Sequence, residues 1–135
     1  MFFCMGLIYA LVSYAITVKD CGVGKSLFNV NHLAISPTNP IAGQNVTLDY
    51  GYTVPSGALI ADGLVKYTVT YNFMPLTPTT EPLCRSTACP ISGGTYTNKT
   101  TMAWPSGISG TMTMKTTWED NAKQLLLCTL ISGSV

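Results

Sequence analysis

The most regular stretch of the sequence is residues 65–73, which read Val-Lys-Tyr-Thr-Val-Thr-Tyr-Asn-Phe. Apolar and aromatic side chains alternate with polar ones at all nine positions, and a period of two puts the two sets on opposite faces of a β-strand. β-Branched and aromatic residues are also the types that strands favour. The face predicted to be buried consists of Val65, Tyr67, Val69, Tyr71 and Phe73.

Other parts of the chain repeat this pattern between turn signals. Residues 46–54 alternate and are expected to stop at Pro55-Ser56-Gly57, and residues 111–118 alternate in the same way. Weaker strand signals cover residues 27–36, 95–101 and 124–131, whereas residues 74–90 are rich in Pro and Thr and predict a long loop. Six or seven short strands without a convincing helix predict an all-β fold, an immunoglobulin-like two-sheet β-sandwich in one domain.

Composition and charge exclude several function classes. The 135 residues fit one domain, and 7 Lys+Arg against 6 Asp+Glu leave no basic patch for a nucleic acid partner. His32 is the only histidine, and its neighbours Leu33 and Ile35 look core-facing, which places His32 at the surface. No pair of carboxylates has a spacing that suggests acid/base chemistry, so we expect no enzyme and no cofactor. A zinc site is not expected, because no second close pair of cysteines and no pair of histidines accompanies Cys84 and Cys89.

The N-terminus differs from the rest of the chain. Residues 2–18 carry no charge, and Ser13-Tyr14-Ala15 offers small residues where a signal peptidase cuts. We therefore predict a secretory signal over residues 1–15 and a mature domain over residues 16–135. The alternatives are a buried helix or a membrane anchor, although 17 uncharged residues fall short of the roughly 20 that span a bilayer. The predicted location is secreted, either extracellular or in the endolysosomal lumen.

Cysteines and sequons agree with export. Without Cys4, the mature chain keeps Cys21, Cys84, Cys89 and Cys128, and four cysteines allow three disulfide patterns. The short loop between Cys84 and Cys89 favours their pairing, which leaves the other two cysteines as partners. The triplets that begin at Asn45 and Asn98 predict N-glycans at the surface.

The predicted inner faces are rich in aromatic residues and methionine. Such side chains fill irregular space and tolerate a deformable guest better than a core of Val and Ile. The alternative is an ordinary filled core. The set comprises Tyr50, Tyr52, Tyr67, Tyr71, Phe73, Met112, Met114 and Trp118.

The order of short landmarks along residues 20–133 resembles the ML lipid-recognition family. These landmarks are Asp20-Cys21-Gly22, Ala34–Pro37, Gly43–Leu48, Cys84, Cys89-Pro90-Ile91, Gly94-Thr95-Tyr96, Trp104-Pro105, Gly110-Thr111-Met112 and Cys128. The resemblance implies an immunoglobulin-like sandwich whose sheets part to admit lipid tails. It also implies disulfides between Cys21 and Cys128 and between Cys84 and Cys89. The chain departs from many relatives because no further Cys pair follows Ser36-Pro37.

Together these features predict a secreted lipid-binding or lipid-transfer protein that holds a sterol or acyl chains between its sheets. We expect an elongated apolar cavity of roughly 300 Å³ or more with no charged wall. The predicted lipid contacts are Tyr50, Val69, Tyr71, Phe73, Trp104, Met112, Met114 and Trp118. Expected partners are a sterol, phospholipid or glycolipid, transient contact with a membrane, and a protein receptor. The alternative is a secreted receptor-binding or surface-coat domain with a filled core.

Overall fold

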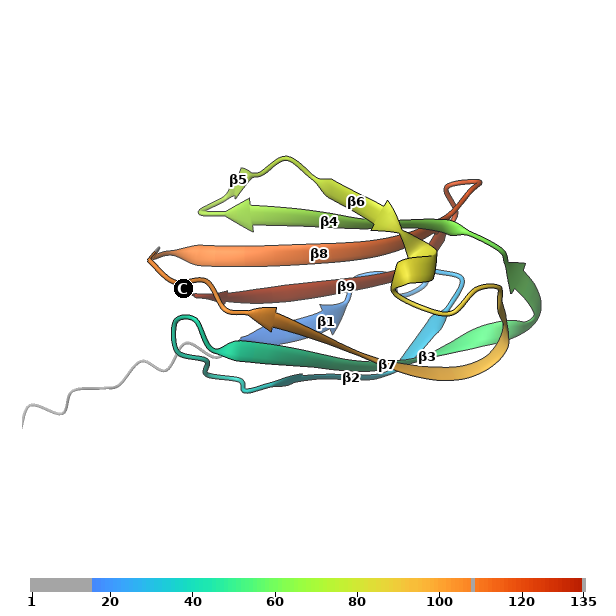
Figure 1. Cartoon of the computed structure of the whole chain (residues 1–135), viewed down its shortest axis with the longest axis horizontal. Coiled ribbons are helices and arrows are strands. Elements are labelled where there is room, and N and C mark those ends of the chain that lie inside the picture. Colours follow the sequence, from blue (N-terminus) through green and yellow to red (C-terminus); the bar gives the residue numbers. More distant parts are fainter. Residues whose placement is uncertain (1–15, 108, 135) are drawn as a thin grey trace, which may run out of the picture.

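Two β-sheets face each other in the computed structural model, which describes residues 16–107 and 109–134 (Figure 1). The larger sheet has the order β1 (Thr17–Asp20), β9 (Leu125–Ser134), β8 (Thr111–Asp120), β4 (Gly63–Tyr71) and β5 (Met74–Pro75), and β6 (Thr79–Pro82) also pairs with β4. The smaller sheet has the order β2 (Asn29–Ser36), β3 (Asn45–Ile60) and β7 (Ile91–Ala103). All pairs are antiparallel, and η1 (Leu83–Arg85) is a single 3-10 turn. The predicted all-β sandwich is confirmed.

The alternating pattern decides which side chains enter the space between the sheets. In β3, Val46, Leu48, Tyr50, Tyr52 and Val54 are all buried. In the opposite sheet, Val65 of β4 pairs with Trp118 of β8, and both are buried. Since directly paired residues lie on the same face, the register aligns the inner positions of β4 and β8 along the interior.

The predicted end of β3 is wrong. The strand does not stop at Pro55-Ser56-Gly57 but continues to Ile60, with an irregular register against β7 between Val54 and Leu59. Gly57 has a φ of 86°, as expected where a bulge bends a strand. A Cβ atom on Gly93 in β7 would lie 2.9 Å from the Pro55 carbonyl oxygen, so the bulge requires glycine opposite it.

The predicted end of the central strand also differs. β4 ends at Tyr71, and Asn72 and Phe73 have φ values of 48° and 65°, so they turn the chain into β5. Phe73 consequently points outward and is 89% exposed, which contradicts its predicted place on the inner face. Residues 74–90 are not one long loop, because they contain β5, β6 and η1. β1 was not predicted from the sequence.

The predicted signal segment, residues 1–15, lies outside the described residues. Within the described part of the chain, no helix has the length and apolarity needed to cross a membrane.

Both disulfides implied by the family resemblance are present. Cys21–Cys128 joins residues 107 positions apart and connects the end of β1 to β9. Cys84–Cys89 closes a short loop after β6. The first bridge fixes the edge strand of the larger sheet, and the second fixes the loop that leads from β6 to β7.

Removing the long-range bridge is expected to cost more stability than removing the short one. In the chain-entropy description, Cys21→Ala with Cys128→Ala lowers the free energy of unfolding by about 4.7 kcal/mol, against about 2 kcal/mol for Cys84→Ala with Cys89→Ala, because the longer loop gains more freedom when unfolded. Urea unfolding measures both values. Equal losses, or a crossed pairing in non-reducing peptide maps, would contradict this assignment.

Candidate functional site

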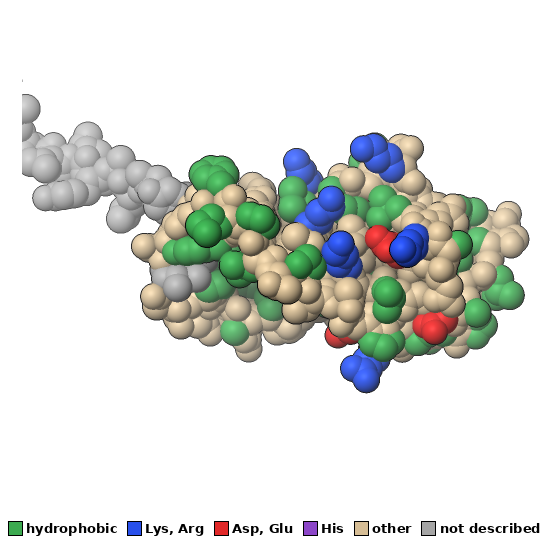
Figure 2. All heavy atoms as spheres, turned by 90° about the horizontal axis from the view of Figure 1, so that it is seen from above, with side chains coloured by type: hydrophobic (Ala, Val, Ile, Leu, Met, Phe, Trp, Pro, Cys, Tyr) green, Lys and Arg blue, Asp and Glu red, His purple; other side chains and the backbone are tan. Residues whose placement is uncertain are grey.

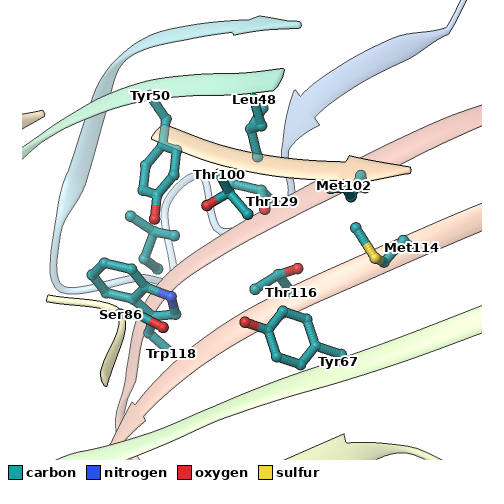
Figure 3. A pocket seen from close by; sticks show the side chains of 11 residues that line it. Leu48, Tyr50, Tyr67, Ser86, Thr100, Met102, Met114, Thr116, Trp118 and Thr129 are labelled. Carbon is teal, nitrogen blue, oxygen red and sulfur yellow. The ribbon is translucent and has the colours of Figure 1, made fainter. Parts of the chain in front are cut away.

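A cavity of about 40 Å³ lies between the two sheets. Figure 3 shows its wall, with side chains of both sheets pointing toward one another. Its lining consists of Leu48, Tyr50, Tyr67, Ser86, Thr100, Met102, Met114, Thr116, Trp118, Leu127 and Thr129. None of these side chains is charged, as predicted for a cavity that accepts lipid.

The cavity is much smaller than the expected 300 Å³ slot. Aromatic rings fill the adjoining part of the interior, where Tyr52 stacks on Phe28 and Tyr96 at centroid distances of 5.5 Å. Trp118 meets Tyr52 edge-on at 5.3 Å and Tyr50 edge-on at 6.0 Å. Space of 40 Å³ suits a few water molecules but not a lipid tail, so binding a lipid requires the wall to move.

Three of the predicted lipid contacts line this cavity, namely Tyr50, Met114 and Trp118. Val69 pairs with Met114, and Met112 pairs with Tyr71, so these residues continue the same inner face toward one end of the sandwich. Trp104 is buried near that end, and its ring would lie 3.2 Å from a Cβ atom on Gly133. Phe73 does not belong to the interior.

Sequence reasoning missed several wall residues as lipid contacts. Leu48 and Thr116 lie within predicted alternating segments, so the strand pattern was the signal that could have found them. Met102 lies one residue past the predicted end of its strand. Ser86 belongs to the loop after η1, and no sequence pattern marks it.

The two long sides of the sandwich differ. On one side β1 lies against β2, and the Ile16 amide donates to the Thr38 carbonyl oxygen at 2.7 Å. On the other side β7 faces β4, and Thr100 of β7 both lines the cavity and is exposed. The cavity therefore reaches the surface between β7 and β4.

A hydrogen-bond network closes one end of this opening. Asn98 Nδ2 on β7 donates to the Tyr50 hydroxyl at 3.0 Å and to the Ser86 carbonyl oxygen at 2.8 Å. Glu81 Oε1 accepts from the Tyr67 hydroxyl at 2.5 Å and from Ser86 Oγ at 3.3 Å. The network joins β7 of the smaller sheet to β4 and β6 of the larger sheet through Ser86, so it acts as a clasp over the cavity.

This bonding bears on the two predicted glycans. An N-glycan replaces one hydrogen of the Asn Nδ2 group, and Asn98 uses both of its hydrogens inside the clasp. A glycan on Asn98 would therefore remove one of these two hydrogen bonds, and glycosylation at Asn98 stays a prediction. Asn45 is exposed at the start of β3, and glycosylation there stays a prediction.

We expect Asn98→Asp to weaken the clasp. The carboxylate cannot donate to Tyr50 or Ser86, and unmade hydrogen bonds in this partly buried site lower the free energy of unfolding by about 1–3 kcal/mol. Chemical denaturation measures this loss. Asn45→Asp removes the other sequon at an exposed site and serves as the control. An unchanged free energy of unfolding in Asn98→Asp would contradict the role of Asn98 in the clasp.

Two tyrosines of the cavity wall stay neutral over a wide pH range. Burial raises the pKa of Tyr50 from its ordinary value of 10.0 to about 12. Burial also raises the pKa of Tyr67 to about 12, with further contributions from its hydrogen bond to Glu81 and from the charge of that group. Both hydroxyls are therefore available as neutral hydrogen-bonding groups.

The raised pKa values predict a loss of stability in alkali. Because the unfolded chain ionises these tyrosines near pH 10.0 and the folded chain only near pH 12, their contribution is complete below about pH 10 and disappears as the pH rises to about 12. Tyr50→Phe should make that fall less steep. Urea unfolding of both proteins at a series of pH values tests this, because the Tyr50→Phe protein reports all groups other than Tyr50. Parallel profiles for the two proteins would contradict it.

The charged side chains of the described residues do not line the cavity. His32 is exposed at the surface as predicted, with Nε2 3.9 Å from an Asp49 carboxylate oxygen. Among the described residues, no group of three or more His, Cys, Asp or Glu side chains could hold a metal ion. The arrangement is suited to binding an apolar guest rather than to chemistry on it.

The fold and the uncharged cavity define the class of this protein as an immunoglobulin-like sandwich with a small uncharged cavity between its sheets. Residues 15–135 match the profile of the ML domain, and the chain belongs to this family, as the sequence landmarks indicated. Members of the family bind or transfer lipids and are not enzymes, which agrees with the prediction that the chain is not one.

Two relatives are similar in sequence. A Dictyostelium discoideum protein, provisionally named a phosphatidylglycerol/phosphatidylinositol transfer protein, is 31% identical over 107 residues, which are 73% of this chain and 72% of the relative. The phosphatidylglycerol/phosphatidylinositol transfer protein of Mycosarcoma maydis is 32% identical over 117 residues, or 82% of this chain. The match spans 61% of the length of the Mycosarcoma maydis protein.

Two solved structures share the fold. A Niemann-Pick type C2 protein from the Japanese carpenter ant has a TM-score of 0.64 at 13% identity, with 87% of this chain and 98% of the other covered. Chicken MD-1, solved with lipid IVa, has a TM-score of 0.60 at 10% identity, with 90% and 89% covered. At these identities the likeness concerns the fold.

Proposed function

We propose that the protein binds a lipid between its two sheets and exchanges it with membranes. The observation that carries this proposal is the uncharged cavity that opens between β7 and β4 in a member of the ML family. Its sequence relatives are named for phosphatidylglycerol and phosphatidylinositol, which favours acyl chains of a phospholipid as the guest, with a sterol as the second candidate.

The wall beside the opening is made of deformable side chains. Met102 on β7 and Met114 on β8 line the cavity and are only partly buried, and Met112 continues this row. An unbranched thioether side chain adopts many rotamers at little cost, so it can leave the interior when a guest enters. The sheets can then separate on the side where β7 faces β4, while β1 and β2 keep the other side closed.

The energetics fit a reversible exchange. Each buried methylene contributes about 0.8 kcal/mol, so a 16-carbon chain offers on the order of 12 kcal/mol before the costs of ordering and opening. A bilayer gives the same chain a similar apolar environment. The free-energy difference between carrier and membrane is therefore small, and the neutral hydroxyls of Tyr67, Thr100 and Ser86 can bind the polar part of the lipid near the opening.

The proposed location is outside the cytosol, either extracellular or in the endolysosomal lumen. Two disulfides in a small domain are typical of proteins that fold in an oxidising compartment. The predicted signal over residues 1–15 supports the same location and is tested by sequencing the N-terminus of the secreted protein.

Filling the cavity should separate lipid binding from folding. Thr116 points into the cavity from β8, and Thr116→Phe should reduce uptake of a fluorescent phospholipid from vesicles by about tenfold, because the ring occupies the guest's space. Overpacking of this kind costs about 1–3 kcal/mol of stability, so the variant should stay folded. Thr113→Phe on the outer face of the same strand is the matched control and should keep normal uptake.

The second candidate function is an interaction domain with a filled core, which the small cavity favours. The two readings differ in what the native protein carries. Organic extraction and mass spectrometry of natively purified protein should find a bound phospholipid or sterol. The interaction domain would be supported instead if the native protein carries no lipid and takes up none from vesicles, and if Thr116→Phe and Thr113→Phe show the same lipid uptake.

A further inference from the structure

Among the described residues, one end of the sandwich has no charged side chain. The four segments that form it are residues 37–48, 67–80, 100–114 and 129–134, and none of them contains Asp, Glu, Lys, Arg or His. The strand directions bring these segments together, since β4 and β7 end there and β3 and β8 begin there (Figure 1). The chain has 13 charged residues, and all of them lie outside these four segments, so this end of the sandwich is built from apolar and uncharged polar residues.

Large apolar side chains protrude from this end. Phe73, Met74 and Leu76 follow one another at the β4–β5 turn and are 89%, 71% and 52% exposed. Ile41, in the loop between β2 and β3, is 74% exposed at the same end. Figure 2 shows hydrophobic side chains gathered toward this end and charged ones set back from it. We call Phe73, Met74 and Leu76 the apolar tip.

The backbone holds the tip in its exposed position against local preference. Phe73 has a φ of 65°, in the left-handed region that a bulky side chain seldom adopts. The turn is held by the Asn72 amide, which donates to the Thr111 carbonyl oxygen at 2.8 Å, and by the Thr111 amide, which donates to Asn72 Oδ1 at 3.0 Å. A strained turn that presents an aromatic ring to solvent indicates that the ring has a partner.

From these features we propose that the apolar tip inserts into the surface of a lipid bilayer. A charge-free end fits this partner, because burying charged groups among acyl chains is costly, whereas exposed apolar side chains gain by leaving water. Apolar groups of peripheral proteins enter the boundary between headgroups and acyl chains by about 5–10 Å. A single protruding turn matches that depth better than it matches the broad patch of a protein interface.

The charged residues behind the tip have the sign and position that suit anionic headgroups. Lys115 is exposed and pairs with Thr68, three residues before the end of β4 and so about 10 Å from it. Lys19 and Lys66 are exposed on the same outer face of the larger sheet. With the tip inserted, these ammonium groups come near the phosphate layer of the membrane.

The tip is also continuous with the proposed route for the lipid. It extends β4, the strand that contributes Tyr67 to the cavity wall and faces β7 across the opening. Docking at the tip therefore places the opening beside the bilayer surface. The inference that docking serves lipid exchange rests on the proposed function, but binding of the tip to a bilayer can be measured separately from lipid uptake.

Phe73→Asn tests the inference, because asparagine tolerates a positive φ and removes the ring. We expect at least a fivefold loss of binding to phosphatidylcholine vesicles containing phosphatidylglycerol, measured by flotation, with a melting temperature no lower than that of the wild type. The matched control is Leu59→Asn, which removes a side chain that is 67% exposed at the other end of β3 and should bind as the wild type does. Equal binding by the wild type and Phe73→Asn would overturn the proposal.

Fluorescence gives a second readout. Trp104 and Trp118 are buried, so Phe73→Trp adds one exposed reporter whose emission should shift to the blue when vesicles are added. An unshifted spectrum would overturn insertion. Uptake of a short-chain fluorescent phospholipid below its micelle concentration should be normal in Phe73→Asn. If the wild type floats with vesicles but takes up no lipid, the docking surface is supported and the proposed function fails. If the wild type takes up lipid and Phe73→Asn floats as well as the wild type, the proposed function is supported and the docking surface fails.

Discussion

Tyr52 packs edge-on against Trp118 across the interior, with ring centroids 5.3 Å apart, and this contact sets how the two sheets pack. Tyr52 comes from the smaller sheet and Trp118 from the larger one, and each is almost fully buried. Further rings extend the cluster on the smaller-sheet side, where Phe28 and Tyr96 flank Tyr52. Large rigid rings fix the spacing of the sheets in this part of the sandwich.

The interior next to this cluster is built differently. Two methionines, three threonines and two leucines line the cavity there beside Tyr50, Tyr67, Ser86 and Trp118, and Met102 and Met114 lie on opposite sheets. The sandwich therefore combines a part packed with aromatic rings and a part that also contains flexible methionines, and the proposed opening lies in the second part. The side between β7 and β4 is held by hydrogen bonds of Asn98 and Glu81 rather than by strand pairing. Few interactions therefore have to break for the sheets to separate on that side.

A second asymmetry follows the long axis of the molecule. Charged side chains occupy one part, and the opposite end is apolar and exposes Phe73 in a strained turn. Strand β4 connects the two features, because its Tyr67 contributes to the cavity wall and its end leads to the apolar tip. A carrier that takes its cargo from a membrane needs such an arrangement, because the guest passes from the bilayer to the interior without crossing water.

The class of fold, the inner faces of β3, β4 and β8, and the uncharged character of the cavity wall could all be predicted from the amino-acid pattern. These follow from a period of two, which any extended chain with one buried face must obey. Family landmarks added the disulfide pairing, which composition alone left open. Three features became visible only in the folded chain: Phe73 faces outward, Asn98 belongs to the clasp, and the cavity is small. The direction of Phe73 depends on the φ angles of a turn, and the bonds of Asn98 reach residues 12 and 48 positions away. The volume between two sheets depends on how rings from distant strands pack, and a local periodic pattern contains none of that information.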